Sequence, residues 1–351
     1  MPLEFRYDDD DFYFEVDSSR KIDSKFDMML KQKWEDAMDK GYFRYKLNFL
    51  ESKILEGKYG FVAQLNVKRA VERRKPQTVS SINMPFDPKL FNFTKVKEEE
   101  ILFYVGRNNE DEEKSGSANM IPHCLLINVS PLEYCNSLLV PYINSCLPQC
   151  ITEGGLQLAV EIVLLSQNHS LKVGFNSLGA YASVNHFHFH IYYLSSKLYL
   201  ETSRAKYLCN GCYLISKYPA EGFAFQVTGI NCKKMVRMLN KLVQFLKDNG
   251  IAHNIFITRG STFEEANEGI TPAVYKAVRI YVWARKSSYG AKNDEAFNPA
   301  LCELAGHLPI KNEKGFSQIS ESQVEDALYQ ACHDTFLAVK ERVEELFSET
   351  N

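Results

Sequence analysis

Three of the eight histidines in this 351-residue chain stand within five residues. His186, His188 and His190 alternate with large apolar residues, and such alternation is typical of a β-strand whose two faces differ. Successive side chains of a strand point to opposite faces, so the three imidazoles are expected to share one face, about 6.6 Å apart. The apolar residues between them are expected to pack into a core.

Two kinds of chemistry use such a row of imidazoles. The first is a zinc site with an open coordination position for a water molecule. In the second, one imidazole is a nucleophile, and its neighbours and the backbone fix its tautomer and stabilise charge around it. A solvated edge strand that carries histidines without a chemical role is the third interpretation.

The segment before the histidines favours the nucleophile. Asn176, Gly179 and Ser183 belong to a stretch of polar and small residues between two apolar runs, which predicts a tight loop that closes a hairpin. Small residues let backbone N–H groups approach an anion closely, and the Ser183 hydroxyl can donate to a phosphate oxygen. A phosphate group needs such a loop, whereas zinc does not.

The order of these residues resembles the histidine-triad superfamily of nucleotide hydrolases and transferases. In residues 174–194 an Asn and a Gly precede Ser-Val-X-His-X-His-X-His, with apolar residues between the histidines. The resemblance implies that His188 attacks an α-phosphorus and becomes nucleotidylated, that Asn176 touches the nucleotide and that Ser183 contacts phosphate. His186, His190 and the loop N–H groups are expected to stabilise the oxygens that gain charge. This scheme requires neither a metal nor a cofactor.

Two further segments carry candidate substrate-binding residues. A basic cluster that includes Arg69 and Arg74 follows a predicted strand. Guanidinium groups bind phosphate bidentately, so this cluster is expected either to hold phosphate or to be an exposed basic loop. In the string INVSPLEYCNSLLVP, the resemblance places Asn128 where an acidic or amide residue binds the ribose hydroxyls. The chain departs from the superfamily at Cys135-Asn136, where Gly-His is usual, although an asparagine there can still form hydrogen bonds.

The elements predicted around these motifs follow one order twice. In the first half, strands are expected at 124–129, 137–140, 171–175 and the histidine row, with a helix at 151–165. In the second half, strands are expected at 213–216, 222–227, 251–260 and 278–286, with a helix at 232–249 and no histidine row. The predicted fold is therefore α+β, with histidine-triad-like antiparallel sheets and helices in two tandem half-domains, of which the second is degenerate.

The predicted organisation has three regions. They are an N-terminal arm with packing helices (1–56), a catalytic histidine-triad-like lobe (57–205), and a degenerate second lobe with a C-terminal helix (206–351). Helices are expected at 22–40 and 45–55, and residues 1–20 are expected to be loosely ordered. The polar and charged segment 106–120 is expected to be a flexible excursion.

Composition limits the classes of protein that fit. Hydrophobic residues at 45% and charged residues at 24% are ordinary for a globular protein. A net charge of −3 gives no electrostatic case for binding nucleic acid. No apolar run approaches the ~20 residues of a membrane-spanning helix, and the acidic N-terminal stretch lacks a hydrophobic signal core. We therefore expect no membrane segment and a cytoplasmic location.

The nine cysteines raise the question of a structural metal site. The number of cysteines is odd and the sequence shows no secretory signal, and both observations argue against a disulfide framework. Cys209 and Cys212 have CxxC spacing, and Cys146 and Cys150 stand four apart, so two such pairs could bind zinc. The alternative is that these residues are ordinary buried thiols.

Longer strings narrow the resemblance to one family. Between residues 25 and 310 the chain contains, in order, GFVAQLN, RRKPQT, FDPKLFNF, INVSPLEY, GFNSLGAYASVNH, IAHNIFITRG and EAFNPALCELAGHLP. This order is similar to that of the GDP-D-glucose phosphorylase family, which is related to plant GDP-L-galactose phosphorylases and galactose-1-phosphate uridylyltransferases. Those relatives carry Gln at the third histidine position, where this chain keeps His190. The family implies a nucleotidyltransferase that converts GDP-glucose and inorganic phosphate into glucose 1-phosphate and GDP, through a guanylylated His188.

Other functions are compatible with the same motifs. One is a histidine-triad hydrolase that acts on nucleotide conjugates. Another is a non-catalytic nucleotide-sugar sensor, although a sensor has no need of a nucleophile between two further imidazoles. A zinc hydrolase built on the three histidines is the last. The sequence does not identify the residues that read guanine, the preferred hexose or the oligomeric state.

Overall fold

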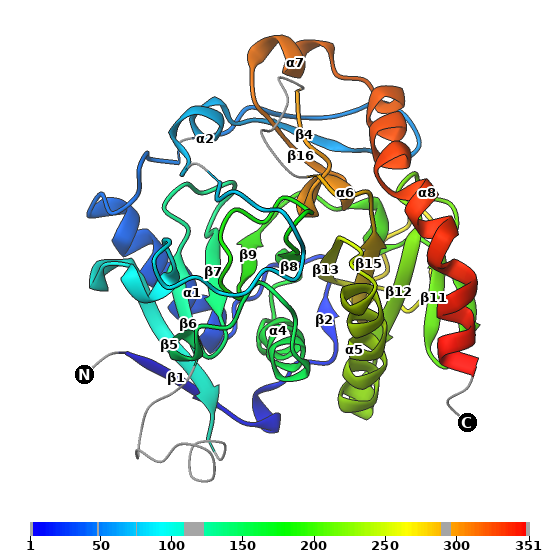
Figure 1. Cartoon of the computed structure of the whole chain (residues 1–351), viewed down its shortest axis with the longest axis horizontal. Coiled ribbons are helices and arrows are strands. Elements are labelled where there is room, and N and C mark those ends of the chain that lie inside the picture. The colour runs from blue at the N-terminus through cyan, green and yellow to red at the C-terminus, as the bar shows by residue number, and fades with distance from the viewer. Residues whose placement is uncertain (1–2, 48, 75, 109–122, 289–295, 349–351) are drawn as a thin grey trace.

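The computed structural model describes residues 3–47, 49–74, 76–108, 123–288 and 296–348 (Figure 1). Most of the excursion predicted at 106–120 lies outside these residues. The helices are α1 (Lys25–Asp39), α2 (Val67–Glu72), α4 (Glu153–Leu165), α5 (Cys232–Asp248), α6 (Leu301–Leu304), α7 (Glu313–Gln318) and α8 (Glu321–Ser348). The strands are β1 (Glu4–Tyr7), β2 (Val16–Asp17), β3 (Ser52–Ile54), β4 (Val62–Leu65), β5 (Ile101–Arg107), β6 (His123–Ile127), β7 (Ser137–Val140), β8 (Leu171–Asn176), β9 (Phe189–Tyr193), β10 (Lys206–Cys209), β11 (Cys212–Ile215), β12 (Gly222–Val227), β13 (His253–Gly260), β14 (Val274–Tyr275), β15 (Ala277–Ala284) and β16 (His307–Ile310).

One large sheet runs through both halves of the chain. In the described residues it has eleven strands in the order β1-β5-β6-β7-β9-β8-β13-β15-β12-β11-β10. Its neighbours pair antiparallel, apart from β1 and β5, which are parallel. The two halves meet where β8 pairs with β13, which places Asn176 opposite Asn254. The α+β fold with antiparallel sheets is thus confirmed, and the halves share a single sheet.

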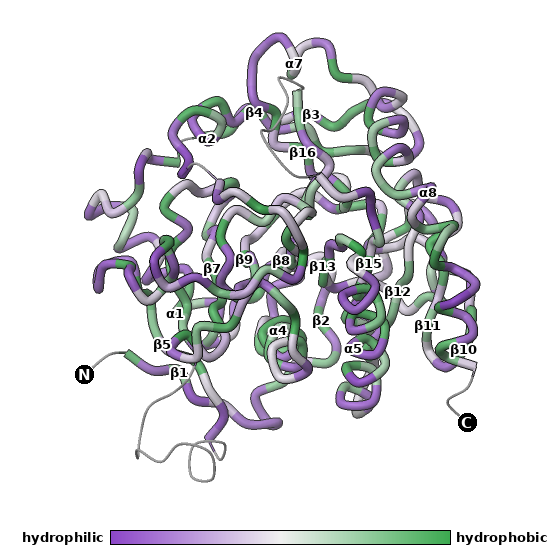
Figure 2. Tube along the Cα trace, viewed as in Figure 1, coloured by the Kyte–Doolittle hydropathy of each residue, from purple (hydrophilic) through white to green (hydrophobic). Residues whose placement is uncertain are grey.

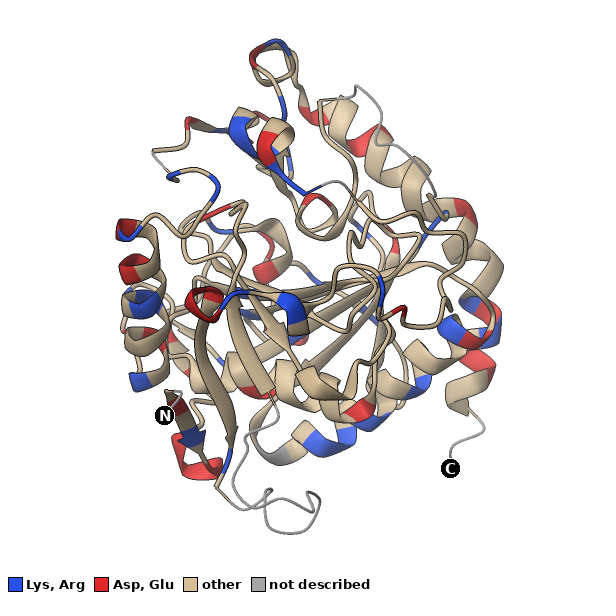
Figure 3. Cartoon of the chain, turned by 60° about the vertical axis from the view of Figure 1, so that its left-hand side comes forward, with Lys and Arg blue, Asp and Glu red and all other residues tan. Residues whose placement is uncertain are grey.

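Helices α4 and α5 cover one face of this sheet, with α1 near the β5 end (Figure 1). Helix α4 is apolar on most of its surface and is almost wholly buried, whereas α5 alternates buried and polar residues (Figure 2). Thr152 caps α4 by accepting a hydrogen bond from Gly155 N, and Ser24 caps α1 in the same way from Asp27 N. Lys/Arg and Asp/Glu residues are interspersed along the outer helices (Figure 3).

The opposite face of the sheet supports a second, smaller layer. A three-stranded sheet of order β16-β4-β3 lies there with α2, α6 and α7 (Figure 1). Its core includes Tyr192 of β9, whereas the neighbouring Ile191 belongs to the core under α4 and α5. This alternation along β9 separates the two layers. Within the smaller layer, α2 from the first half of the chain lies beside residues 298–312 from the second half, and both segments line one cavity.

Two predictions about the N-terminal region are wrong. Residues 52–54 form β3, paired with β4, where a helix over 45–55 was expected. Tyr45 is buried and donates from its hydroxyl to the Pro131 carbonyl, so tertiary contacts override the helical spacing of the apolar residues. The arm expected to be loosely ordered is held as the edge strand β1, and Tyr13 N donates to the Leu164 carbonyl at 2.8 Å.

The helices expected at 22–40, 151–165 and 232–249 are confirmed as α1, α4 and α5, and the expected C-terminal helix is confirmed as α8. The hairpin expected at 124–140 is confirmed as β6 and β7. Helices long and apolar enough to cross a membrane do not occur in the part of the chain that the structure describes.

Candidate functional site

The histidine row lies at the start of β9 and in the segment before it. The predicted strand is shorter than expected, because β9 begins at Phe189 and His186 and His188 precede it. The alternation of faces is nevertheless confirmed around these residues. Phe187 and Phe189 pack in the helix-covered core, while the rings of His188 and His190 lie 5.4 Å apart between centroids.

His188 is held in the tautomer that a nucleophile requires. Its Nδ1 lies 2.7 Å from the His186 carbonyl oxygen, so Nδ1 carries the hydrogen and donates it. The lone pair is then on Nε2, the ring nitrogen left to face the cavity that His188 lines. Burial lowers the pKa of His188 to about 4, although the hydrogen bond to His186 opposes the shift. The imidazole is therefore neutral at neutral pH.

His186 has a different position from the one expected. Its ring is fully buried, stacks on Phe93 with centroids 5.3 Å apart, and meets the Phe86 ring edge-on. Its Nδ1 accepts a hydrogen bond from Phe93 N at 3.0 Å. His186 lines neither of the cavities described below, and its carbonyl oxygen is the group that contacts the His188 ring.

Gln149 fixes the main chain on both sides of the loop between β8 and β9. Its Oε1 accepts a hydrogen bond from His188 N at 2.9 Å. Its Nε2 donates to the carbonyl oxygens of His188 at 3.1 Å and Asn176 at 2.9 Å. The Asn185 side chain accepts a hydrogen bond from Gln149 N at 2.9 Å. This buried amide therefore ties the end of β8 to the approach to β9.

The loop between β8 and β9 is longer than the tight turn that was expected, since it spans residues 177–188. Gly179 adopts a positive φ of 73°, which glycine tolerates without strain, and its carbonyl accepts from Ser288 N at 2.7 Å. Asn254 donates from Nδ2 to the Ala180 carbonyl at 3.1 Å. Gly179 thus shapes the loop from outside the cavities.

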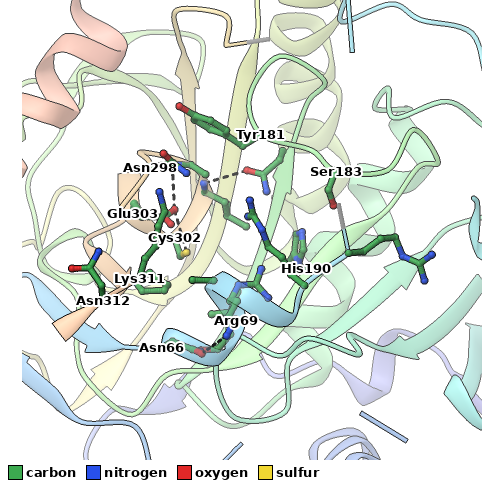
Figure 4. A pocket seen from close by; sticks show the side chains of 18 residues that line it. Asn66, Arg69, Tyr181, Ser183, His190, Asn298, Cys302, Glu303, Lys311 and Asn312 are labelled. Carbon is green, nitrogen blue, oxygen red and sulfur yellow. Dashed lines mark hydrogen bonds between the residues drawn. The ribbon is translucent and has the colours of Figure 1, made fainter. Parts of the chain in front are cut away.

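Two cavities meet beside His190. The smaller one, of about 90 Å³, is lined by His188, and the larger one has a volume of about 380 Å³ (Figure 4). Both are lined by Arg69, Arg74, Ser183 and His190. These shared residues combine two guanidinium groups, a hydroxyl and an imidazole, which is a set suited to phosphate oxygens.

The basic cluster predicted near Arg69 lies at this junction. Arg69, on α2, donates to the Ser130 carbonyl, and the Arg74 guanidinium lies 3.3 Å from the centroid of the Phe91 ring. Arg73 lines the larger cavity. Burial lowers the pKa of Arg73, the charge of Arg69 lowers it further, and Glu303 opposes both. Positive charge held this close together favours an anionic ligand.

Asn128 and Asn176 line different cavities. Asn128 lines the smaller one, and its Nδ2 donates to Oδ1 of Asn136 at 2.9 Å. Asn136 is fully buried and donates in turn to the Ile191 carbonyl at 3.0 Å, so it has a structural role. Asn176 lines the larger cavity, where its Oδ1 accepts from Asn254 Nδ2 at 2.6 Å and from Leu301 N at 3.1 Å.

Sequence reasoning missed one wall of the larger cavity. It consists of Asn66, Tyr181, Asn298, Glu303, Lys311 and Asn312 (Figure 4). Four of these residues come from the second half of the chain: Asn298 lies before α6, Glu303 lies in α6, and Lys311 and Asn312 follow β16. Asn298 and Glu303 fall within the string EAFNPALCELAGHLP. That string indicated the family, but it did not indicate that these two residues line a cavity.

Neither zinc hypothesis gains support from the geometry. Within the described ranges, no three His, Cys, Asp or Glu side chains are grouped so that they could hold a metal ion. All nine cysteines lie in those ranges as free thiols. Burial raises the pKa of Cys212 and of Cys150, which is typical of unreactive thiols.

The fold is similar to that of a yeast enzyme of known structure. The structure of yeast Ap4A phosphorylase Apa2 in complex with Ap4A is similar, with a TM-score of 0.55 and 15% identity, over 89% of this chain and 98% of that chain. A further structure of yeast Ap4A phosphorylase Apa2 gives a TM-score of 0.57 and 16% identity, over 89% of this chain and 98% of that chain.

Sequence comparisons then define the family. Residues 25–192 match "GDPGP1-like, N-terminal domain" and residues 206–350 match "GDPGP1-like, C-terminal domain". GDP-D-glucose phosphorylase 1 of Danio rerio is 43% identical over 92% of each chain, and that of Homo sapiens is 42% identical over 88% of this chain and 80% of its own. GDP-L-galactose phosphorylase 2 of Arabidopsis thaliana is 33% identical over 83% of this chain and 68% of its own. The chain belongs to the GDP-D-glucose phosphorylase family, which confirms the resemblance of its motifs.

Proposed function

We propose that this protein is a GDP-hexose phosphorylase that converts GDP-glucose and inorganic phosphate into glucose 1-phosphate and GDP. The observation that carries the proposal is the neutral imidazole of His188, with Nδ1 bonded to a carbonyl and Nε2 left for a cavity. The names of its relatives, GDP-D-glucose phosphorylase 1, support the choice of nucleotide and hexose.

In the first step, the lone pair of His188 Nε2 attacks the α-phosphorus of GDP-glucose. The N–P bond forms as the bond from that phosphorus to the bridging oxygen breaks, and glucose 1-phosphate leaves with the bonding electrons. The product of this step is a guanylylated His188. The imidazole gains positive charge, which the hydrogen bond from Nδ1 to the His186 carbonyl stabilises.

In the second step, an oxygen of inorganic phosphate attacks the same phosphorus. The N–P bond breaks, its electrons return to Nε2, and GDP leaves. Arg69, Arg74, Ser183 and His190 line both cavities, so they can stabilise the α-phosphate oxygens in both steps. Arg73 and Lys311 of the larger cavity can hold the phosphate that leaves or attacks.

Trapping the intermediate tests the mechanism. GDP-glucose without phosphate should add the mass of GMP to the intact protein, and acid should release it because an N–P bond is labile. Phosphate should discharge the adduct as GDP, and glucose 1-phosphate should regenerate GDP-glucose. Initial rates should give parallel double-reciprocal lines. The His188→Asn variant is the control and should form no adduct.

Two results would contradict the proposal. Converging lines, with no adduct at quench times shorter than a turnover, would indicate direct attack by phosphate. Release of GMP at the same rate with and without phosphate would instead indicate a nucleotide-conjugate hydrolase.

A further inference from the structure

The smaller cavity has the lining expected for a purine. Its walls are aromatic and aliphatic, and they are formed by Phe91, Phe93, Val96, Leu126, Leu138 and Val184. The Phe91 and Phe93 rings lie 6.0 Å apart at 85°. The Arg74 guanidinium covers one face of Phe91 and His186 stacks on one face of Phe93, so a flat base can pack only against the ring surfaces that these residues leave uncovered. Asn128 and Ser130 add polar groups beside these walls.

The larger cavity has the opposite character. Amide, carboxylate, guanidinium and ammonium groups line it, which suits the hydroxyl groups of a hexose and a phosphate (Figure 4). Because four residues line both cavities, a phosphorus atom held by them is adjacent to each. A nucleotide sugar therefore fits with its base in the smaller cavity and its hexosyl phosphate in the larger one.

One carboxylate occurs among the described residues that line the smaller cavity, and it belongs to Glu100. Glu100 ends the short 3-10 helix Glu98–Glu100 and is half-buried, whereas Glu98 and Glu99 are exposed. Its Oε1 accepts a long hydrogen bond of 3.4 Å from Lys97 N. A weak contact of this kind leaves the carboxylate available to a ligand.

We propose that Glu100 is the residue that selects guanine, by accepting hydrogen bonds from N1–H and the 2-amino group of the base in the smaller cavity. The inference rests on the proposed function and names how that site recognises its nucleotide. Guanine presents two neighbouring donors on this edge, and a carboxylate has two acceptor oxygens. Adenine presents the lone pair of N1 there instead, which a carboxylate repels.

The rival residue is Glu303 in the larger cavity (Figure 4). Its Oε2 already accepts from Ala300 N at 3.2 Å and lies 3.3 Å from the Cys302 thiol. Burial lowers the pKa of Arg73 and of Arg74, while Glu303 raises the pKa of the first and Glu100 raises that of the second. Each carboxylate therefore faces one guanidinium, and the contacts to Ala300 and Cys302 are what distinguish Glu303. These contacts give Glu303 a structural role at the start of α6, in the wall of the larger cavity that we assign to the hexosyl phosphate.

Nucleotide binding by Glu100→Gln tests the assignment. The parent protein should bind GDP more tightly than IDP, which lacks the 2-amino group, and IDP more tightly than ADP. Glutamine keeps one acceptor and adds a donor, so Glu100→Gln should lose roughly 10- to 100-fold in GDP affinity. GDP and IDP should then bind within about threefold of each other, while ADP should bind no more weakly than before. Titration calorimetry with the three nucleotides measures these ratios, and Glu100→Ala repeats the test with both acceptors removed.

Two matched variants make the result specific. Glu98→Gln, on the same short helix, should leave the GDP-to-ADP ratio unchanged, and Glu303→Gln should leave it within about threefold. A change in that ratio with Glu303→Gln, but not with Glu100→Gln, would place guanine in the larger cavity and overturn the proposal. An equal change in the ratio with Glu98→Gln would show that the loss of any nearby negative charge has this effect, and it would also overturn the proposal for Glu100. Phosphorolysis of GDP-glucose is measured separately, so a failure of the proposed reaction does not alter the binding ratios that test Glu100.

Discussion

Replacing Gln149 with leucine should lower both stability and catalytic rate, because this side chain binds the main chain of His188, the proposed nucleophile. Leucine has a similar size but cannot form hydrogen bonds. The substitution therefore leaves three main-chain groups without the amide that now binds them: the N–H and carbonyl of His188 and the carbonyl of Asn176. Gln149 is 1% exposed, so bulk water does not reach these groups in its place.

The expected loss in the free energy of unfolding follows from the number of hydrogen bonds that the substitution removes. A buried polar group without a partner costs about 1–2 kcal/mol, so three such groups predict a loss of about 3–6 kcal/mol in the free energy of unfolding. This is a large share of the stability of an ordinary domain, but it is compatible with folding at low temperature. The kcat should fall about 100-fold, because a displacement of the His188 backbone by about 1 Å misaligns Nε2 with the phosphorus.

Denaturant unfolding and steady-state kinetics measure the two effects on the same preparation. Gln157→Leu is the matched control, since Gln157 lies half-buried on α4 and donates to Glu161, which keeps Tyr7 and Arg107 as partners. The control should lose about 1 kcal/mol or less. If Gln149→Leu unfolds within about 1 kcal/mol of the control and keeps its kcat within about threefold, the amide does not position His188.

Three further perturbations follow from the site. His188→Ala should fold normally and lose phosphorolysis by several orders of magnitude, because a nucleophile has no substitute; activity within about tenfold of the parent would refute the assignment. Ser183→Ala should lose about 1–3 kcal/mol of transition-state binding, measured as kcat/KM, and an unchanged value would remove the hydroxyl from the site. Burial lowers the pKa of His123, His188 and His253 to about 4, so between about pH 6.5 and 4 the unfolded chain binds more protons than the folded one. The free energy of unfolding should therefore fall as the pH is lowered through this window, and a constant value would contradict the neutral burial of these imidazoles.

The sequence predicted the elements whose patterns are local. Helices α4 and α5 have long runs of apolar residues at helical spacing, and their observed bounds differ from the predicted ones by two residues or fewer. The helix expected at 45–55 failed because β3 gains its hydrogen bonds from β4, a contact that spacing within the segment does not encode. The arm failed for the same reason, since β1 pairs with β5 about one hundred residues away in the chain.

The candidate site divides in a similar way. The histidine row, Ser183 and the cluster at Arg69 were identifiable because their residue types recur at short spacing. The structure brings His188, His190, Ser183 and the arginines together at the two cavities, whereas His186 lines neither of them. Gln149 and Glu100 were not identified, because a single polar residue beside an apolar run has many possible roles. The proposed functions of these two residues follow from where the fold places them. Gln149 stands 39 residues before His188 in the chain and contacts its main chain, and Glu100 stands directly before β5 and lines the same cavity as His188.

The second half of the chain lacks a histidine row, yet it supports the loop that carries the proposed nucleophile. Strand β13 supplies the partner of β8, so the backbone of the strand that leads into the catalytic loop is paired on both sides. Asn254 of β13 and the N-terminal N–H of α6 both donate to the Asn176 side chain, which fixes its orientation at the cavity. Leu301 packs directly on Gly174, where a side chain at position 174 would collide with it. The second half of the chain, which has no histidine row, therefore provides one wall of the larger cavity. It also holds the loop between β8 and β9, which leads to the proposed nucleophile His188.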